Sequence, residues 1–153
     1  KGYHGDCART WPCGNVKSDR LKLIEVTEQS FFEGLKYAHP GNRLSDISHA
    51  IEMYAKKFNY GVVRDFTGHG VGSKLHEDPA VPNYGKEGMG PVLRKGMTLA
   101  IEPMINMGTY KVKILADGWT TITSDHSPSA HYENSIVITD NGYEILTKIK
   151  END

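Results

Sequence analysis

The sequence lacks several features that would assign a chain to a large class of proteins. It has no apolar run of the length that crosses a bilayer, which takes about 20 residues. It also has no run of lysine and arginine, and its net charge is −1 with both signs interspersed. Neither DNA nor a membrane is therefore indicated as a partner. We expect a substrate that is a small molecule or a peptide.

Cysteine is scarce as well. Cys7 and Cys13 are the only two, and their spacing matches neither a disulfide framework nor a Cys-Xaa-Xaa-Cys site. Free thiols in a reducing cytoplasm are the simplest interpretation, so we expect a cytoplasmic protein. The sequence shows no internal repeat or low-complexity segment, and 153 residues suffice for a single domain with a sizeable core.

Common motifs for hydrolysis and nucleotide binding are absent too. Residues 76–80 begin with His-Glu but lack the second histidine of His-Glu-Xaa-Xaa-His. Gly-His-Gly-Val-Gly at 68–72 is followed by Ser73, where a dinucleotide-binding fingerprint needs glycine or alanine. No Ser/His/Asp or Cys/His nucleophile motif is found. These absences leave a metal-dependent hydrolase as the main candidate for an enzyme.

Hydrophobic periodicity predicts two helices, over residues 19–37 and 44–59. The expected buried stripes are Leu21, Ile24, Phe31, Leu35 and Ala38 in the first helix, and Leu44, Ile47, Ile51, Tyr54 and Phe58 in the second. His-Pro-Gly at 39–41 and Gly61 act as the two stop signals. We expect both helices to cover a sheet.

The rest of the chain predicts short strands separated by glycine and proline turns. The expected strands are residues 2–11, 62–66, 98–106, 110–115, 120–124, 129–139 and 143–146. The first of them has no hairpin mate directly after it, so we expect its partner to precede Lys1. Residues 77–96 predict a surface loop, and Asp-Asn-Gly at 140–142 predicts a hairpin turn. This order indicates an α+β fold with an antiparallel sheet covered by two helices.

Four side chains are candidates for holding a cation. Glu102 and Glu133 lie in apolar runs typical of strands. Burying a carboxylate there costs on the order of several kcal/mol of solvation free energy unless a partner offsets the cost. His69 lies in a glycine-rich turn, where the backbone can approach a ligand closely, and Asp6 lies on the first strand. Each has an ordinary alternative: a turn cap for His69, an exposed strand residue for either glutamate, a turn acid for Asp6. If they converge, three carboxylates and one imidazole suit Mn, Fe or Co, or a paired-metal centre, better than a structural zinc.

Seven short motifs resemble those of one enzyme family. They are Gly-Asp-Cys-Ala-Arg-Thr-Trp (5–11), Gly-His-Gly-Val-Gly (68–72), Leu-His-Glu-Asp-Pro (75–79), Leu-Arg-Lys-Gly-Met-Thr (93–98), Ile-Glu-Pro-Met (101–104), Asp-Gly-Trp-Thr (117–120) and Ser-Ala-His-Tyr-Glu (129–133). In this order they resemble type I methionine aminopeptidases over nearly the whole chain. The resemblance implies the pita-bread (creatinase/aminopeptidase-like) fold with a dimetal site at the centre of the sheet. It also implies that a metal-activated hydroxide removes the initiator methionine from nascent peptides.

The resemblance further implies a role for each candidate ligand. Asp6 and Glu133 would bridge two divalent ions, and His69 and Glu102 would complete the ligand set of one of them. The ions would be Co, Mn, Fe or Zn. Glu102 would also carry a proton during the reaction.

The substrate residues follow from the same resemblance. His76 would contact the scissile peptide and act with Glu102 in catalysis. Leu75 and Trp119 would form walls of the pocket for the methionine side chain. The expected substrate is a peptide with N-terminal methionine, the ribosome is a further candidate partner, and the protein is expected to be a monomer.

The family has an upstream Asp-Xaa-Gly strand and an upstream histidine that this sequence does not contain. We therefore expect residues 1–153 to be a single partial catalytic domain that lacks the family's N-terminal strands and helices. One divalent ion should be held well and a second weakly, because only the bridging pair would serve the second. The chain alone is expected to be weakly active or inactive.

Two other functions stay open. A non-catalytic module could use the same fold to bind peptides or a ribosomal partner. A proline-directed aminopeptidase of the same superfamily is the second alternative, although such enzymes tend to show Glu-Pro-Gly and Arg-Ile-Glu-Asp. This chain has Glu-Pro-Met at 102–104 and Tyr-Glu-Asn at 132–134 instead.

Overall fold

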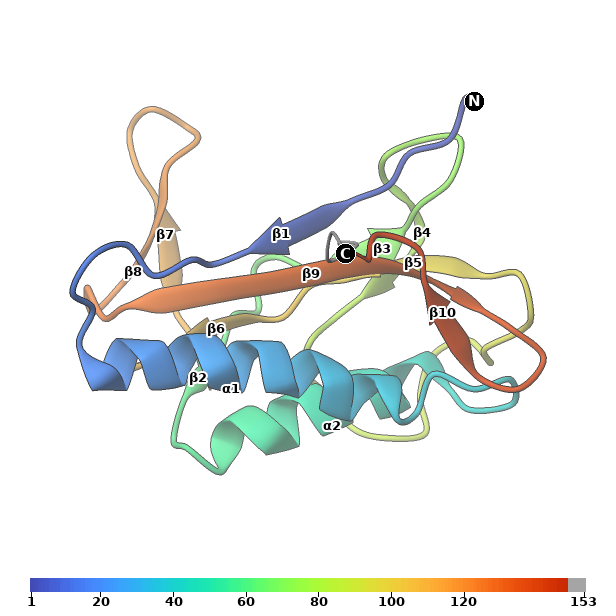
Figure 1. Cartoon of the computed structure of the whole chain (residues 1–153), viewed down its shortest axis with the longest axis horizontal. Coiled ribbons are helices and arrows are strands. Elements are labelled where there is room, and N and C mark those ends of the chain that lie inside the picture. The colour runs from blue at the N-terminus through green and yellow to red at the C-terminus, as the bar shows by residue number, and fades with distance from the viewer. Residues whose placement is uncertain (149–153) are drawn as a thin grey trace.

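The structure, a computed structural model, describes residues 1–148. Two helices lie side by side and cover one face of an antiparallel sheet (Figure 1). They are α1 (Ser18–Leu35) and α2 (Leu44–Lys56). The predicted α+β class is thus confirmed. No helix of this described part is long and apolar enough to cross a membrane.

The buried face of α1 differs from the predicted stripe. Leu21 is 44% exposed, whereas Leu23, Thr27 and Ser30 are buried. Because α1 packs against both α2 and the sheet, its contact face is broad enough to bury Leu23, Thr27 and Ser30 as well as Phe31 and Leu35. The two buried hydroxyls are satisfied inside the helix, since Thr27 Oγ1 donates to the Leu23 carbonyl and Ser30 Oγ donates to the Thr27 carbonyl, each at 2.7 Å.

The face of α2 is also rotated from the prediction. Tyr54 and Phe58 are only half-buried, and Glu52 and Ala55 are buried in their place. The Glu52 carboxylate tolerates this position because it pairs with Lys56 at 2.9 Å and accepts a backbone hydrogen bond at 3.0 Å. A charged residue that finds partners can therefore occupy a position that hydrophobic periodicity assigns to an apolar one.

Within residues 1–148 the main sheet has eight strands, and all its pairs are antiparallel. Its strands are β1 (Cys7–Arg9), β2 (Gly61–Val62), β3 (Gly68–Gly70), β4 (Glu77–Val81), β5 (Thr98–Ile101), β6 (Met104–Asn106), β9 (Ser129–Ile138) and β10 (Tyr143–Ile145). A separate hairpin consists of β7 (Val112–Ile114) and β8 (Thr121–Thr123). Strand β9 is the centre, since β5 and β6 pair along one edge and β1 and β10 along the other. The predicted turn at 140–142 is confirmed by the β9–β10 pair.

Three features of the strands were not foreseen. Strand β1 has a partner within the chain, the far-downstream strand β9, whereas the sequence indicated no such mate. Residues 77–81, expected to belong to a loop, form β4 and pair with β3. The expected strand at 98–106 is divided into β5 and β6 at Glu102 and Pro103, because proline has no N–H to donate to the ladder.

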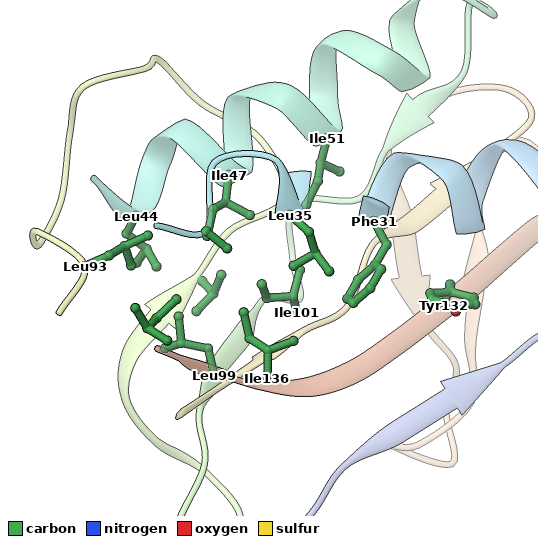
Figure 2. Packing of buried hydrophobic residues seen from close by; sticks show 13 residues of the cluster. Phe31, Leu35, Leu44, Ile47, Ile51, Leu93, Leu99, Ile101, Tyr132 and Ile136 are labelled. Carbon is green, nitrogen blue, oxygen red and sulfur yellow. The ribbon is translucent and has the colours of Figure 1, made fainter. Parts of the chain in front are cut away.

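The hydrophobic core lies between the helices and the sheet (Figure 2). Its largest fully buried side chains include Phe31, Leu35, Ile47, Ile51, Leu99, Ile101 and Ile136. On β9 the core residues are Tyr132, Ile136 and Ile138, which are spaced by even numbers along the strand. Because successive strand side chains point to opposite faces, His131 and Glu133 point away from the helices. The polar candidate residues of β9 therefore lie on the face of the sheet that the helices do not cover, which we call the open face.

Candidate metal centre

The four predicted ligands meet on this open face. His69 comes from β3, Glu133 from β9, Asp6 from just before β1, and Glu102 from just after β5. His69 Nε2 lies 3.4 Å from Glu102 Oε1 and 3.8 Å from Asp6 Oδ2. One ligand atom each from Asp6, His69 and Glu133 lies within 4.8 Å of the others. Residues up to 127 positions apart in the sequence are thus brought to a single point.

The sheet register explains why the two glutamates meet. Ile101 pairs with Asn134 and Met104 pairs with His131, so β5 and β6 run along β9 in one register. Glu102, in the break between them, consequently falls opposite Glu133. Its carbonyl, released from the ladder, accepts a hydrogen bond from Asn83 Nδ2 at 3.0 Å. The break at Pro103 therefore leaves both carboxylates on one face without an unsatisfied Glu102 carbonyl.

His69 does not lie in a turn, contrary to the prediction, but in strand β3. The glycines on either side permit neighbouring strands to approach closely. A Cβ at Gly68 would lie 2.2 Å from the Ala100 carbonyl oxygen, and a Cβ at Gly70 would lie 2.2 Å from that of Asp78. The glycine pattern thus serves strand packing around the imidazole. His69 Nδ1 is 2.8 Å from the Gly70 carbonyl oxygen, which leaves Nε2 facing the carboxylates.

The carboxylates repel one another in a desolvated setting. Burial, followed by the charges of Glu133 and Asp6, raises the pKa of Glu102 to about 8. Burial and the charge of Asp6 raise the pKa of Glu133 to about 7, against a smaller opposite effect of Arg9. Glu133 Oε1 is buried and has no hydrogen-bond partner within residues 1–148. A cation would relieve both the repulsion and the missing contact, so this donor set fits a divalent ion.

His76 lies close to the centre, on the loop between β3 and β4. Its ring centroid is 4.3 Å from that of His69. It borders an open cleft of about 590 Å³ together with Ser73, Lys74, Glu77 and Asp78. A peptide lying in this cleft would therefore pass beside the candidate ligands.

The other two predicted substrate residues are exposed. Leu75 is 39% exposed on the same loop, and Trp119 is 88% exposed on the loop between β7 and β8. That hairpin stands away from the sheet, on the side opposite the helices (Figure 1). The assignment of Leu75 and Trp119 to a methionine pocket stays a prediction.

One residue of the site was missed by the sequence analysis. His131 Nε2 lies 3.7 Å from Glu102 Oε2 and 3.9 Å from Glu133 Oε2. The signal was present, since His131 precedes Glu133 by two positions and strand periodicity puts both on one face. Burial lowers the pKa of His131 below its usual range. Glu102, His131 and Glu133 form a second group of donor atoms that all lie within 4.8 Å of one another.

The chain is similar to known methionine aminopeptidases. It is 56% identical over 149 residues to a methionine aminopeptidase of Clostridium perfringens, which covers 97% of this chain and 60% of the relative. A solved methionine aminopeptidase from Thermotoga maritima is 48% identical with a TM-score of 0.95, over 97% of this chain and 60% of that one. A prolidase from Pyrococcus horikoshii is more distant, at 26% identity and a TM-score of 0.75, over 97% of this chain and 37% of that one.

These likenesses confirm the predicted pita-bread fold. The chain spans about three fifths of the length of the methionine aminopeptidases that it matches. The sequence also matches metallopeptidase family M24 over residues 1–140. Because the matched range is most of the chain and contains every one of the converging side chains, this chain belongs to metallopeptidase family M24.

Proposed function

We propose that this chain acts in the removal of N-terminal methionine from peptides, with divalent cations held by Asp6, His69, Glu102 and Glu133. The observation that supports this most is the convergence of the four side chains, with His69 Nε2 within 3.8 Å of both Asp6 and Glu102. The relative at 56% identity bears the name methionine aminopeptidase. In this proposal Asp6 and Glu133 are bridging carboxylates.

A bound divalent cation would lower the pKa of a water molecule and polarise the carbonyl of the scissile peptide. Glu102 is the group that accepts and returns a proton, because its carboxylate lies at the centre of the site, 3.4 Å from His69 and 3.7 Å from His131. His76, beside His69, donates a ring N–H to the peptide and positions it. Leu75 and Trp119 contact the methionine side chain once a peptide is bound.

The proposal favours methionine over proline specificity. Relatives that are 44% to 57% identical to this chain bear the name methionine aminopeptidase. The prolidase is only 26% identical. A purely peptide-binding role is less well supported, because binding alone does not require three buried or half-buried carboxylates around one imidazole. The family's divalent metal would be Co, Mn, Fe or Zn.

The proposed activity carries further expectations about partners and location. Nascent peptides are the source of initiator methionine, so the proposal implies a cytoplasmic protein that meets the ribosome. Co-sedimentation with ribosomes and the mass of the protein in solution test the ribosomal contact and the monomeric state.

The test is release of free methionine from a Met-Ala-Ser peptide in the presence of Mn²⁺ or Co²⁺. Matched Leu-Ala-Ser and Ala-Pro-Ser peptides report specificity. We expect slow release of methionine only, in keeping with the weak activity expected of this chain, and loss of at least about a hundredfold in kcat for Glu102→Gln. Glu25→Gln, which neutralises an exposed carboxylate on α1, is the control. Hydrolysis of the proline peptide in preference, or full activity of Glu102→Gln, would contradict the proposal.

A further inference from the structure

A histidine outside the predicted ligand set faces the same carboxylates. His131 Nε2 is buried and has no hydrogen-bond partner within the described residues. It lies 3.7 Å from Glu102 Oε2 and 3.9 Å from Glu133 Oε2. A buried imidazole nitrogen that faces two carboxylates and has no hydrogen-bond partner is well placed to bind a cation.

The backbone around His131 is held firmly, so the side chain has a defined direction. On one edge His131 pairs with Met104 of β6. On the other, its N–H donates to Thr10 Oγ1 at 2.8 Å, and the same hydroxyl donates to the His131 carbonyl at 3.0 Å. Because both edges are bonded, the ring is aimed at the carboxylates by the strand itself.

The distances match those between donors that share one ion. Two donors about 2.1 Å from a cation, at angles of about 110–135°, lie roughly 3.4–3.9 Å apart. The separations of His131 Nε2 from the two glutamates, 3.7 and 3.9 Å, fall in this range. The separation of His69 Nε2 from Glu102, 3.4 Å, does so too.

Glu102 lies between the two imidazoles, with Oε1 toward His69 and Oε2 toward His131. The donor atoms therefore form two groups that share Glu133: one with Asp6 and His69, the other with Glu102 and His131. Each group has an imidazole and two carboxylates, a donor set suited to a divalent ion.

We propose that His131 Nε2 is a metal ligand and that, with Glu102 and Glu133, it forms a second cation position beside the one at His69. This inference rests on the proposed function for the identity of the first position. It changes two expectations from the sequence. The carboxylates shared by the two positions become Glu102 and Glu133 instead of Asp6 and Glu133, and the second ion has three donors instead of a bridging pair alone. With His131 as a further donor, the chain binds two divalent ions.

The experiment observes the imidazoles directly. The whole chain is labelled with ¹⁵N in its histidines and titrated with ¹¹³Cd²⁺, and coupling between the metal and ring nitrogens is recorded by NMR. We expect two histidines to couple at two equivalents of Cd²⁺, and His131→Gln to remove one of them. The same variant weakens one of two Cd²⁺ binding steps in calorimetry by at least about tenfold, because even indirect partners of a ligand matter that much.

His39→Gln is the matched control, since His39 is exposed on the loop between the helices and should leave both couplings intact. The wild-type couplings do not depend on any variant folding, and His131→Asn provides a second assignment. If His69 couples and His131 does not, the inference is wrong while the proposed function stands. If His131 alone couples, the inference stands and the proposed role of His69 fails. If neither couples, both fail.

Discussion

Cation binding to this site should release protons in an amount set by pH. In the metal-free protein, burial and like charges raise the pKa of Glu102 to about 8 and of Glu133 to about 7. Both carboxyl groups therefore hold protons under mildly acidic conditions. Since a carboxylate must be deprotonated to bind a cation, loading the site expels these protons.

The magnitude follows from the two pKa values. Near pH 6 both groups are almost fully protonated, so about two protons leave for each loaded site. At about pH 7.5 roughly one proton leaves, and at about pH 9 almost none. By linkage, the logarithm of the apparent association constant rises by nearly two per pH unit around pH 6 and levels off above about pH 9. The sum over both groups is the quantity to compare, because neighbouring carboxylates titrate as a pair.

Calorimetric titration with Mn²⁺ in two buffers of different ionisation enthalpy measures the released protons. Glu102→Gln should lower the release at about pH 6 to roughly one proton, because burial and Asp6 still act on Glu133. Glu25→Gln, exposed on α1, should leave it unchanged. A release below about half a proton at pH 6, or one that does not vary with pH, would refute the account of the site as a cluster of mutually repelling, buried carboxyls.

Three further predictions concern stability. The metal-free protein should lose stability as the pH rises from about 4.5 to 8, because raised pKa values mean that the folded state holds more protons than the unfolded chain. The loss in urea unfolding with EDTA should be about 5–7 kcal/mol, and Glu102→Gln should remove about 4 kcal/mol of it. Rising stability over that range would be inconsistent with the assigned directions. Gly70→Ala, whose Cβ would lie 2.2 Å from the Asp78 carbonyl oxygen, should cost about 1–3 kcal/mol, whereas Gly5→Ala, with only a side-chain methyl at 3.4 Å, should change stability by less than about 0.5 kcal/mol. Equal effects of the two would argue against close packing of β3. Phe31→Ala should cost about 3–5 kcal/mol, because the ring is fully buried against Phe32 and Tyr132, while Met53→Ala on the exposed side of α2 should be nearly neutral in the same thermal unfolding assay.

Short-range sequence patterns predicted much of the secondary structure. The two helices begin and end within a few residues of the predicted bounds, because helical spacing and stop signals act over short distances. Predictions failed where a neighbour far away in the sequence intervened. Thr27 and Ser30 are buried because α1 contacts both α2 and the sheet, and residues 77–81 form a strand because β3 offers them an edge.

For the candidate ligands, too, local sequence predicted some features, and others depended on distant neighbours. A glutamate in an apolar run and a histidine between glycines attract notice in the sequence, because a buried charge needs a partner. The reason for the glycines was misjudged, since they let β4 and β5 approach His69 rather than form a turn. His131 was passed over although its spacing puts it on the same strand face as Glu133. Its second contact, with Glu102, depends on the pairing of β9 with β6.

By itself, the sequence determined which residue types were available, which short segments would be helix or strand, and the resemblance to a metallopeptidase family. Only the tertiary structure decided that Asp6, His69, Glu102, His131 and Glu133 share one surface, since that depends on strand order and register. The same contacts raise the pKa values of Glu102 and Glu133, because electrostatic repulsion acts through space and not along the chain.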